Sequence, residues 1–145
     1  MGLLDLFGKS DKGRGPQFKA VQKLPWARSV KGGFQKLLFI DPDDEKIQGG
    51  GIVVVWHGGI RPAWVYVADV TNVGQEIGDI LNNKEIMSYE NRGGLYVTWV
   101  NIQAEFRPGV VRYLIDKMHP VVDNPSEPPS DVEPIAVYFP GKEDT

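Results

Sequence analysis

Two short apolar segments joined by a glycine-containing turn constrain the fold more than any other feature of this chain. Gly51–Trp56 and Ala63–Ala68 are rich in β-branched and aromatic residues, and the turn between them contains Gly58, Gly59 and Pro62. Strand-like segments that flank a short Gly/Pro turn predict an antiparallel β-hairpin. An isolated hairpin is only marginally stable in water, so further elements must cover its apolar faces.

The rest of the chain supplies elements that could cover the hairpin. Residues 72–87 place Val73, Ile77, Ile80 and Leu81 at helical spacing, although Gly74 and Gly78 weaken that helix by up to about 1 kcal/mol each. Leu95–Val100 alternates like a strand, and Pro108 opens a second helix whose apolar stripe runs from Val110 to Met118. The order predicts an α+β fold, in which a small antiparallel sheet is flanked by helices.

Composition divides the chain of 145 residues into three parts. Residues 1–16 form an amphipathic, basic, flexible leader, residues 17–124 one α+β domain, and residues 125–145 a Pro-rich acidic tail. Within the domain, Phe34–Ile40 predicts an additional N-terminal strand, and within the tail Ile135–Phe139 predicts a late edge strand. A single domain of this size fits the chain length.

Charge and cysteine content exclude several classes of protein. The chain has no cysteine, so it has neither a disulfide framework nor a thiolate nucleophile, and a reducing cytoplasm is the expected compartment. Residues 1–36 carry a net charge of +6, whereas the remaining residues carry −9. An acidic body disfavours tight nucleic-acid binding, which depends on clustered Lys and Arg. The expected partner is therefore a protein.

The leader is the predicted contact segment for a membrane surface or a partner. Its apolar residues fall on one side of a short helical turn: Leu3, Leu4, Leu6 and Phe7. Residues 1–9 would attach weakly, because burial of a few side chains is offset by the cost of ordering so short a helix. The alternative is that the leader packs back on its own domain.

The hairpin and its neighbours resemble the GIY-YIG nuclease domain. Gly51-Ile52-Val53 stands where that family has GIY, and Tyr66-Val67-Ala68 stands where it has YIG. Leu95–Val100 resembles the third strand, and Val111–Asn124 resembles the helix that follows it and ends in Leu-Ile, proline and asparagine. The resemblance covers residues 51–124 and implies a ββαβα core.

The chain departs from the family at its catalytic positions. The resemblance implies that two tyrosines, an arginine and a metal-binding glutamate assemble one phosphodiesterase site. Here Tyr66 keeps the second tyrosine, but Val53 replaces the first, Glu76 replaces the arginine and Val111 replaces the glutamate. Phosphodiester cleavage needs a cation or metal to receive developing negative charge, so we expect no metal, no cofactor and no ordinary nuclease mechanism.

The leading hypothesis is a non-catalytic binding or adaptor domain that reuses the former active-site face. That face is predicted to contain Trp56, His57, Arg61, Tyr66 and Tyr113. A first alternative is a divergent metal-dependent nuclease that recruits Glu76, Tyr66, His57 and Arg112. A second alternative is attachment through the leader.

Three further groups have less specific interpretations. His57 either lines a binding cleft or is a solvated turn residue, and His119 is expected to cap a helix C-terminus. Asp41, Asp43, Asp44 and Glu45 form either a loose Ca²⁺ loop or, as we prefer, a solvated acidic turn.

Overall fold

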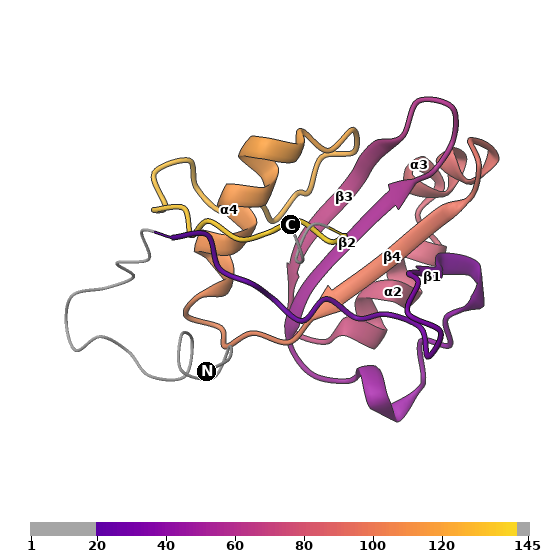
Figure 1. Cartoon of the computed structure of the whole chain (residues 1–145), viewed down its shortest axis with the longest axis horizontal. Coiled ribbons are helices and arrows are strands. Elements are labelled where there is room, and N and C mark those ends of the chain that lie inside the picture. The colour runs from indigo at the N-terminus through magenta and orange to yellow at the C-terminus, as the bar shows by residue number, and fades with distance from the viewer. Residues whose placement is uncertain (1–19, 142–145) are drawn as a thin grey trace.

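A four-stranded antiparallel sheet lies at the centre of the computed structural model, which describes residues 20–141. The strands are β1 (Gln35–Lys36), β2 (Gly51–His57), β3 (Ala63–Val70) and β4 (Leu95–Val100), and their order in the sheet is β1-β4-β2-β3. Figure 1 shows α4 (Arg107–Met118) and α2 (Val73–Leu81) on opposite sides of this sheet. The α+β prediction is confirmed.

The predicted hairpin is the two-stranded centre of the sheet. β2 pairs with β3 in antiparallel register from Gly51 opposite Val70 to His57 opposite Ala63. The register shifts between Val55 and Trp56, because β3 carries one extra residue there, Val65. On its other side β2 pairs with β4, so both edges of this apolar strand are hydrogen-bonded and its first five residues are buried.

The two faces of the sheet have separate cores. The α2 face, which also packs against α3 (Lys84–Met87), buries Val53, Val55, Tyr66 and Ala68. The α4 face buries Ile52, Val54 and Val67 against the apolar stripe of α4. Because side chains alternate along a strand, neighbouring residues of β2 contribute to different cores. Full burial of each such side chain contributes about 1.5–3 kcal/mol to folding.

The helix predicted over residues 72–87 is interrupted at Asn82 and Asn83. The Asn82 side chain donates to the Gly78 carbonyl oxygen (3.2 Å) at the end of α2, and the Asn83 side chain accepts from the Ile86 amide (3.0 Å) at the start of α3. Asparagine side chains compete in this way with the helical backbone. One long helix therefore becomes two short ones.

The strand predicted over Phe34–Ile40 is limited to β1, two residues long. The chain then turns into a short 3-10 helix, Leu37–Phe39, that buries Leu37 completely and leaves Phe39 81 % exposed. The alternation of the strand is lost because the segment turns away from β4 to place Leu37 in the core. This part of the prediction was too long.

Residues 125–141, predicted as a tail, pack against the domain instead. Ile135 and Val137 are buried on the α4 face, and the Ile135 amide donates to the Gly109 carbonyl (2.9 Å). The predicted strand Ile135–Phe139 is reduced to one parallel bridge, Gln22 to Val137. The leader residues Leu3, Leu4, Leu6 and Phe7 lie outside the described residues.

Within residues 20–141, no helix combines the length and the apolar character that crossing a membrane requires.

Candidate binding site

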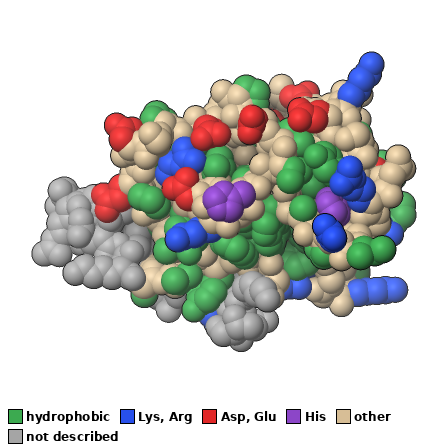
Figure 2. Space-filling model, turned by 90° about the horizontal axis from the view of Figure 1, so that it is seen from above, with side chains coloured by type: hydrophobic (Ala, Val, Ile, Leu, Met, Phe, Trp, Pro, Cys, Tyr) green, Lys and Arg blue, Asp and Glu red, His purple; other side chains and the backbone are tan. Residues whose placement is uncertain are grey.

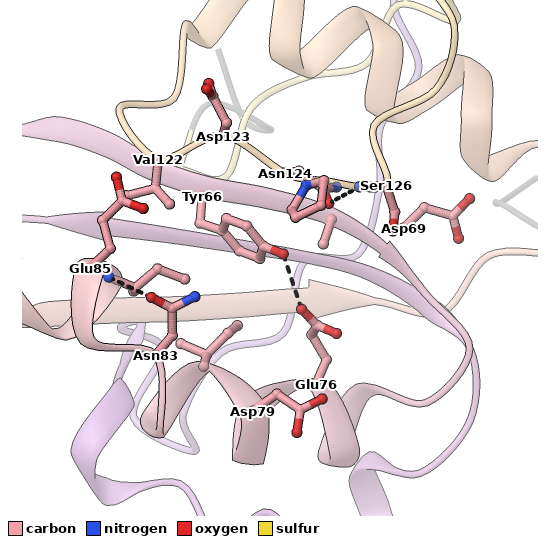
Figure 3. Close-up of a pocket in the computed structure, with 14 residues that line it drawn as sticks. Tyr66, Asp69, Glu76, Asp79, Asn83, Glu85, Val122, Asp123, Asn124 and Ser126 are labelled. Carbon is pink, nitrogen blue, oxygen red and sulfur yellow. Dashed lines mark hydrogen bonds between the residues drawn. The ribbon is translucent and has the colours of Figure 1, made fainter.

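An acidic pocket of about 350 Å³ lies on the α2 face, beside the outer edge of β3. Four parts of the chain line it: β3, α2, the start of α3 and the segment that follows α4 (Figure 3). That last segment is held along β3 by hydrogen bonds from the Val122 amide to the Val65 carbonyl (2.9 Å) and from the Asn124 side chain to the Val67 carbonyl (3.1 Å). Residues far apart in the sequence thus form one cavity.

Tyr66 and Glu76 form the polar centre of this pocket. The Tyr66 hydroxyl donates to the Glu76 carboxylate at 3.3 Å, as Figure 3 shows. Glu76 reaches this position because Asn72 caps the start of α2, where its side chain accepts from the Gln75 amide (2.9 Å). A carboxylate in the first turn is also favoured by the helix dipole.

Burial affects the ionisation of both groups. Burial, followed by the charge of Glu76 and the hydrogen bond to it, raises the pKa of Tyr66 to about 12. Burial also raises the pKa of Glu76; the Tyr66 hydrogen bond acts in the opposite direction, and neighbouring Asp79 adds to the rise. The phenol therefore stays protonated at neutral pH and acts as a donor.

The lining is negatively charged. It contains five carboxylates and no Lys, Arg or His: Asp69, Glu76, Asp79, Glu85 and Asp123. Asp69 is neutralised by Arg107 at 2.7 Å, from outside the lining. Asp79, Glu85 and Asp123 are exposed, and none of the three is in an ion pair with another described residue. The pocket therefore presents an unneutralised negative field to solvent.

The predicted binding face does not form one surface. Tyr66 lies at the acidic pocket, whereas His57 and Arg61 line a different pocket at the end of the hairpin. Trp56 and Tyr113 pack against the core of the α4 face, so the sheet separates them from Tyr66.

The positions that the GIY-YIG resemblance would make catalytic are also divided between the two faces. Glu76, which stands at the arginine position of the resemblance, lies against Tyr66. Val53 is fully buried on the same face but does not line the pocket. Val111 is fully buried on the α4 face, on the other side of the sheet. The glutamate position of the resemblance is therefore not part of the Tyr66 site in this chain.

Arg112, His57 and His119 lie in three different surroundings, and none of them lines the acidic pocket. Arg112 is buried, pairs with Asp116 (2.9 Å) and Glu127 (3.1 Å), and donates to the Pro128 carbonyl (2.8 Å), so it attaches the C-terminal segment to α4. His119 is the C-cap of α4, through its backbone amide and a left-handed conformation with φ 52°. His57 is only 4 % exposed, so its interpretation as a solvated turn residue is wrong.

Metal coordination receives no support from the geometry. Among residues 20–141, no group of three or more His, Asp or Glu side chains is arranged to hold a metal ion. The acidic turn Asp41–Glu45 instead satisfies its own backbone: Asp41 accepts from the Asp43 amide (3.0 Å) and Asp44 from the Lys46 amide (2.9 Å).

Sequence reasoning missed Asp79, Glu85 and Asp123 as members of one site. Asp79 is spaced three residues from Glu76 on one helix, and that spacing was the available signal. Asp123 enters from a distant segment, and no local pattern indicates this. In comparisons with known proteins, no protein-family model, no curated protein and no solved structure matches the chain.

Proposed function

We propose that this chain is a non-catalytic binding domain whose acidic pocket receives a positively charged side chain of a partner protein. The observation that carries the proposal is the combination of an open cavity, a half-buried Glu76 bonded to the buried Tyr66, and carboxylates without a neutralising cation. Two opposite charges 4 Å apart attract by about 1 kcal/mol in water and about 4 kcal/mol near a protein surface. A lysine or arginine side chain would benefit from several such interactions.

The same charges disfavour a phosphate ligand. A phosphodiester that approached Tyr66 would meet Glu76 at 3.3 Å from the phenol oxygen, with Asp79 beside it in the lining. Like charges at such distances repel by as much as opposite charges attract. A degenerate GIY-YIG-like scaffold in the cytoplasm, which has kept its hairpin and lost its phosphate chemistry, fits this arrangement.

The test is a titration with short capped peptides, Gly-Arg-Gly, Gly-Lys-Gly and Gly-Glu-Gly, followed by amide NMR shifts. We expect saturable shifts around Asp79 and Asp123 with the two basic peptides and none with the acidic peptide. Asp79→Asn and Asp123→Asn should each weaken binding, whereas Asp131→Asn, an exposed carboxylate outside the pocket, should not. Equal binding by all three variants would refute the proposal.

A divergent enzyme is the second candidate, because a carboxyl with a raised pKa beside a phenol in a polar pocket is typical of an active site. The lining offers no cation for the charge that develops in phosphoryl transfer. We therefore expect purified protein not to cleave DNA or RNA with Mg²⁺ or Mn²⁺. Metal-dependent cleavage that is lost in Tyr66→Phe would establish the enzyme instead.

A further inference from the structure

A second pocket, of about 470 Å³, lies at the end of the hairpin and has the opposite charge. It is lined by the β2–β3 turn and by the loop that leads into β4: His57, Gly59, Ile60, Arg61, Asn91, Arg92 and Gly93. No Asp or Glu lines it, and it shares no residue with the acidic pocket. In Figure 2, several Lys and Arg side chains lie around a histidine towards the right-hand end of the molecule.

Glycines bring the two loops of this pocket into contact. A Cβ atom on Gly59 would overlap the carbonyl oxygen of Arg92, and one on Gly93, whose φ is +97°, would lie 2.7 Å from the Gly59 backbone. Only glycine allows two backbones to approach so closely. The contact places Arg61 and Arg92, which are 31 positions apart in the sequence, at the same cavity.

The two arginines of this pocket are not neutralised by a carboxylate of the described chain. The Arg92 guanidinium lies 5.0 Å from the centroid of the Tyr89 ring, a cation–π contact that leaves its N–H groups available. Neither Arg61 nor Arg92 is in an ion pair with another residue of the described part of the chain. Both side chains are exposed.

His57 contributes a buried donor to this pocket. Its ring is 4 % exposed and stacks on Tyr89, with centroids 5.9 Å apart and planes 9° apart. Its Nδ1 accepts the Gly59 amide at 3.4 Å, which leaves Nε2 as the ring atom that can donate to a ligand. Within residues 20–141 no hydrogen-bond partner of Nε2 is present. A buried N–H without a partner is costly unless a ligand or water accepts it.

We infer that this pocket binds the phosphate group of a phosphate monoester, held by Arg61, Arg92 and His57. A planar carboxylate is satisfied by one bidentate guanidinium, whereas a tetrahedral phosphate accepts from donors in several directions. Ile60, which is fully exposed beside the pocket, would contact the organic part of the ester. This site is independent of the cationic ligand proposed above.

The test is an NMR or calorimetric titration with inorganic phosphate, O-phosphoserine and serine at low ionic strength. We expect the two phosphates to bind saturably with shifts at the Gly59 and Gly93 amides, and serine not to bind. Arg61→Gln and Arg92→Gln should each raise the Kd about tenfold, and the double variant more. Lys117→Gln, which removes an exposed cation from α4, should leave the Kd unchanged.

Ile60→Ser distinguishes the two sources of phosphate. If an ester is the ligand, O-phosphoserine binds more tightly than inorganic phosphate and loses that advantage in Ile60→Ser; equal affinities indicate free phosphate. The inference is overturned if no saturable shift occurs, or if the double variant binds as well as the unmodified protein. Arg61 and Arg92 are exposed, so these variants should fold, and an unchanged unfolding midpoint verifies this.

Discussion

Two glycines in α2 should respond in opposite directions to the same substitution. Gly78→Ala places a methyl group 3.6 Å from Pro42 Cβ, an ordinary contact. Alanine is about 0.8–1 kcal/mol better than glycine in a helix interior, so this variant should be stabilised by about 0.5–1 kcal/mol. At Gly74 the methyl group would overlap the Pro42 carbonyl oxygen and lie 2.6 Å from Gln48 Nε2.

The cost at Gly74 follows from the loop that packs there. Gln48 Nε2 donates to the Pro42 carbonyl (3.1 Å) and to the Asp44 carbonyl (2.8 Å), and the new methyl group would separate these atoms. Overpacking costs about 1–3 kcal/mol and each lost hydrogen bond about 0.5–1.5 kcal/mol. After the gain in helix propensity, Gly74→Ala should be destabilised by about 1–5 kcal/mol.

Urea unfolding followed by circular dichroism measures both effects. With a slope near 2 kcal/mol/M, the midpoint should rise by about 0.3–0.5 M in Gly78→Ala and fall by about 0.5–2.5 M in Gly74→Ala. Gln48→Ala removes one of the obstructing groups, so its effect should not add fully to that of Gly74→Ala. If Gly74→Ala is as stable as Gly78→Ala, the packing of residues 42–48 on α2 is wrong.

Three further predictions concern single side chains. Arg112→Met should lower the free energy of unfolding by about 2–3 kcal/mol, because the buried Pro128 carbonyl loses the charged donor that lies 2.8 Å away. Thermal unfolding measures this effect, and an unchanged midpoint would contradict it. Between pH 10 and 12 the unfolded chain ionises Tyr66 while the folded chain, with its pKa raised to about 12, keeps the proton, so stability falls. In alkaline denaturation, Tyr66→Phe should lose about 2 kcal/mol less stability over this pH range than the unmodified protein. Equal losses of stability in the two proteins would argue against the Tyr66–Glu76 contact. His119→Gly should stabilise by about 0.5–1 kcal/mol in urea, because only glycine adopts the left-handed cap of α4 without strain; a loss of stability would refute this.

The elements with strong local periodicity could be predicted from the sequence. Leu95–Val100 is a strand with the predicted bounds, and the helix that Pro108 opens ends at Met118 as its apolar stripe requires. Both segments have enough apolar residues to be buried on one face, so tertiary contacts reinforce the local preference. The antiparallel hairpin was predictable for the same reason.

Elements that depend on distant contacts could not be predicted. Residues 125–141 have the composition of a linker, yet Ile135, Val137 and the Arg112 ion pair dock them on α4. The sequence also did not indicate on which face of the sheet a site residue lies. Tyr113 and Tyr66 are on opposite faces and are separated by the sheet. Arg92 was missed because its pocket exists only when two loops meet.

The docking of the C-terminal segment has a consequence for circular permutation of this chain. The Gln22 amide donates to the Ala136 carbonyl and the Tyr138 amide to the Gln22 carbonyl, both at 2.9 Å, and the Trp26 indole donates to the Tyr138 carbonyl at 2.9 Å. The first and last segments of the described chain thus lie side by side and run in the same direction, so Gly141 lies near Phe34 rather than beside residue 20. A circularly permuted version, with a linker long enough to run back along these two parallel segments and new ends opened in the exposed stretch 129–131, would keep both pockets intact.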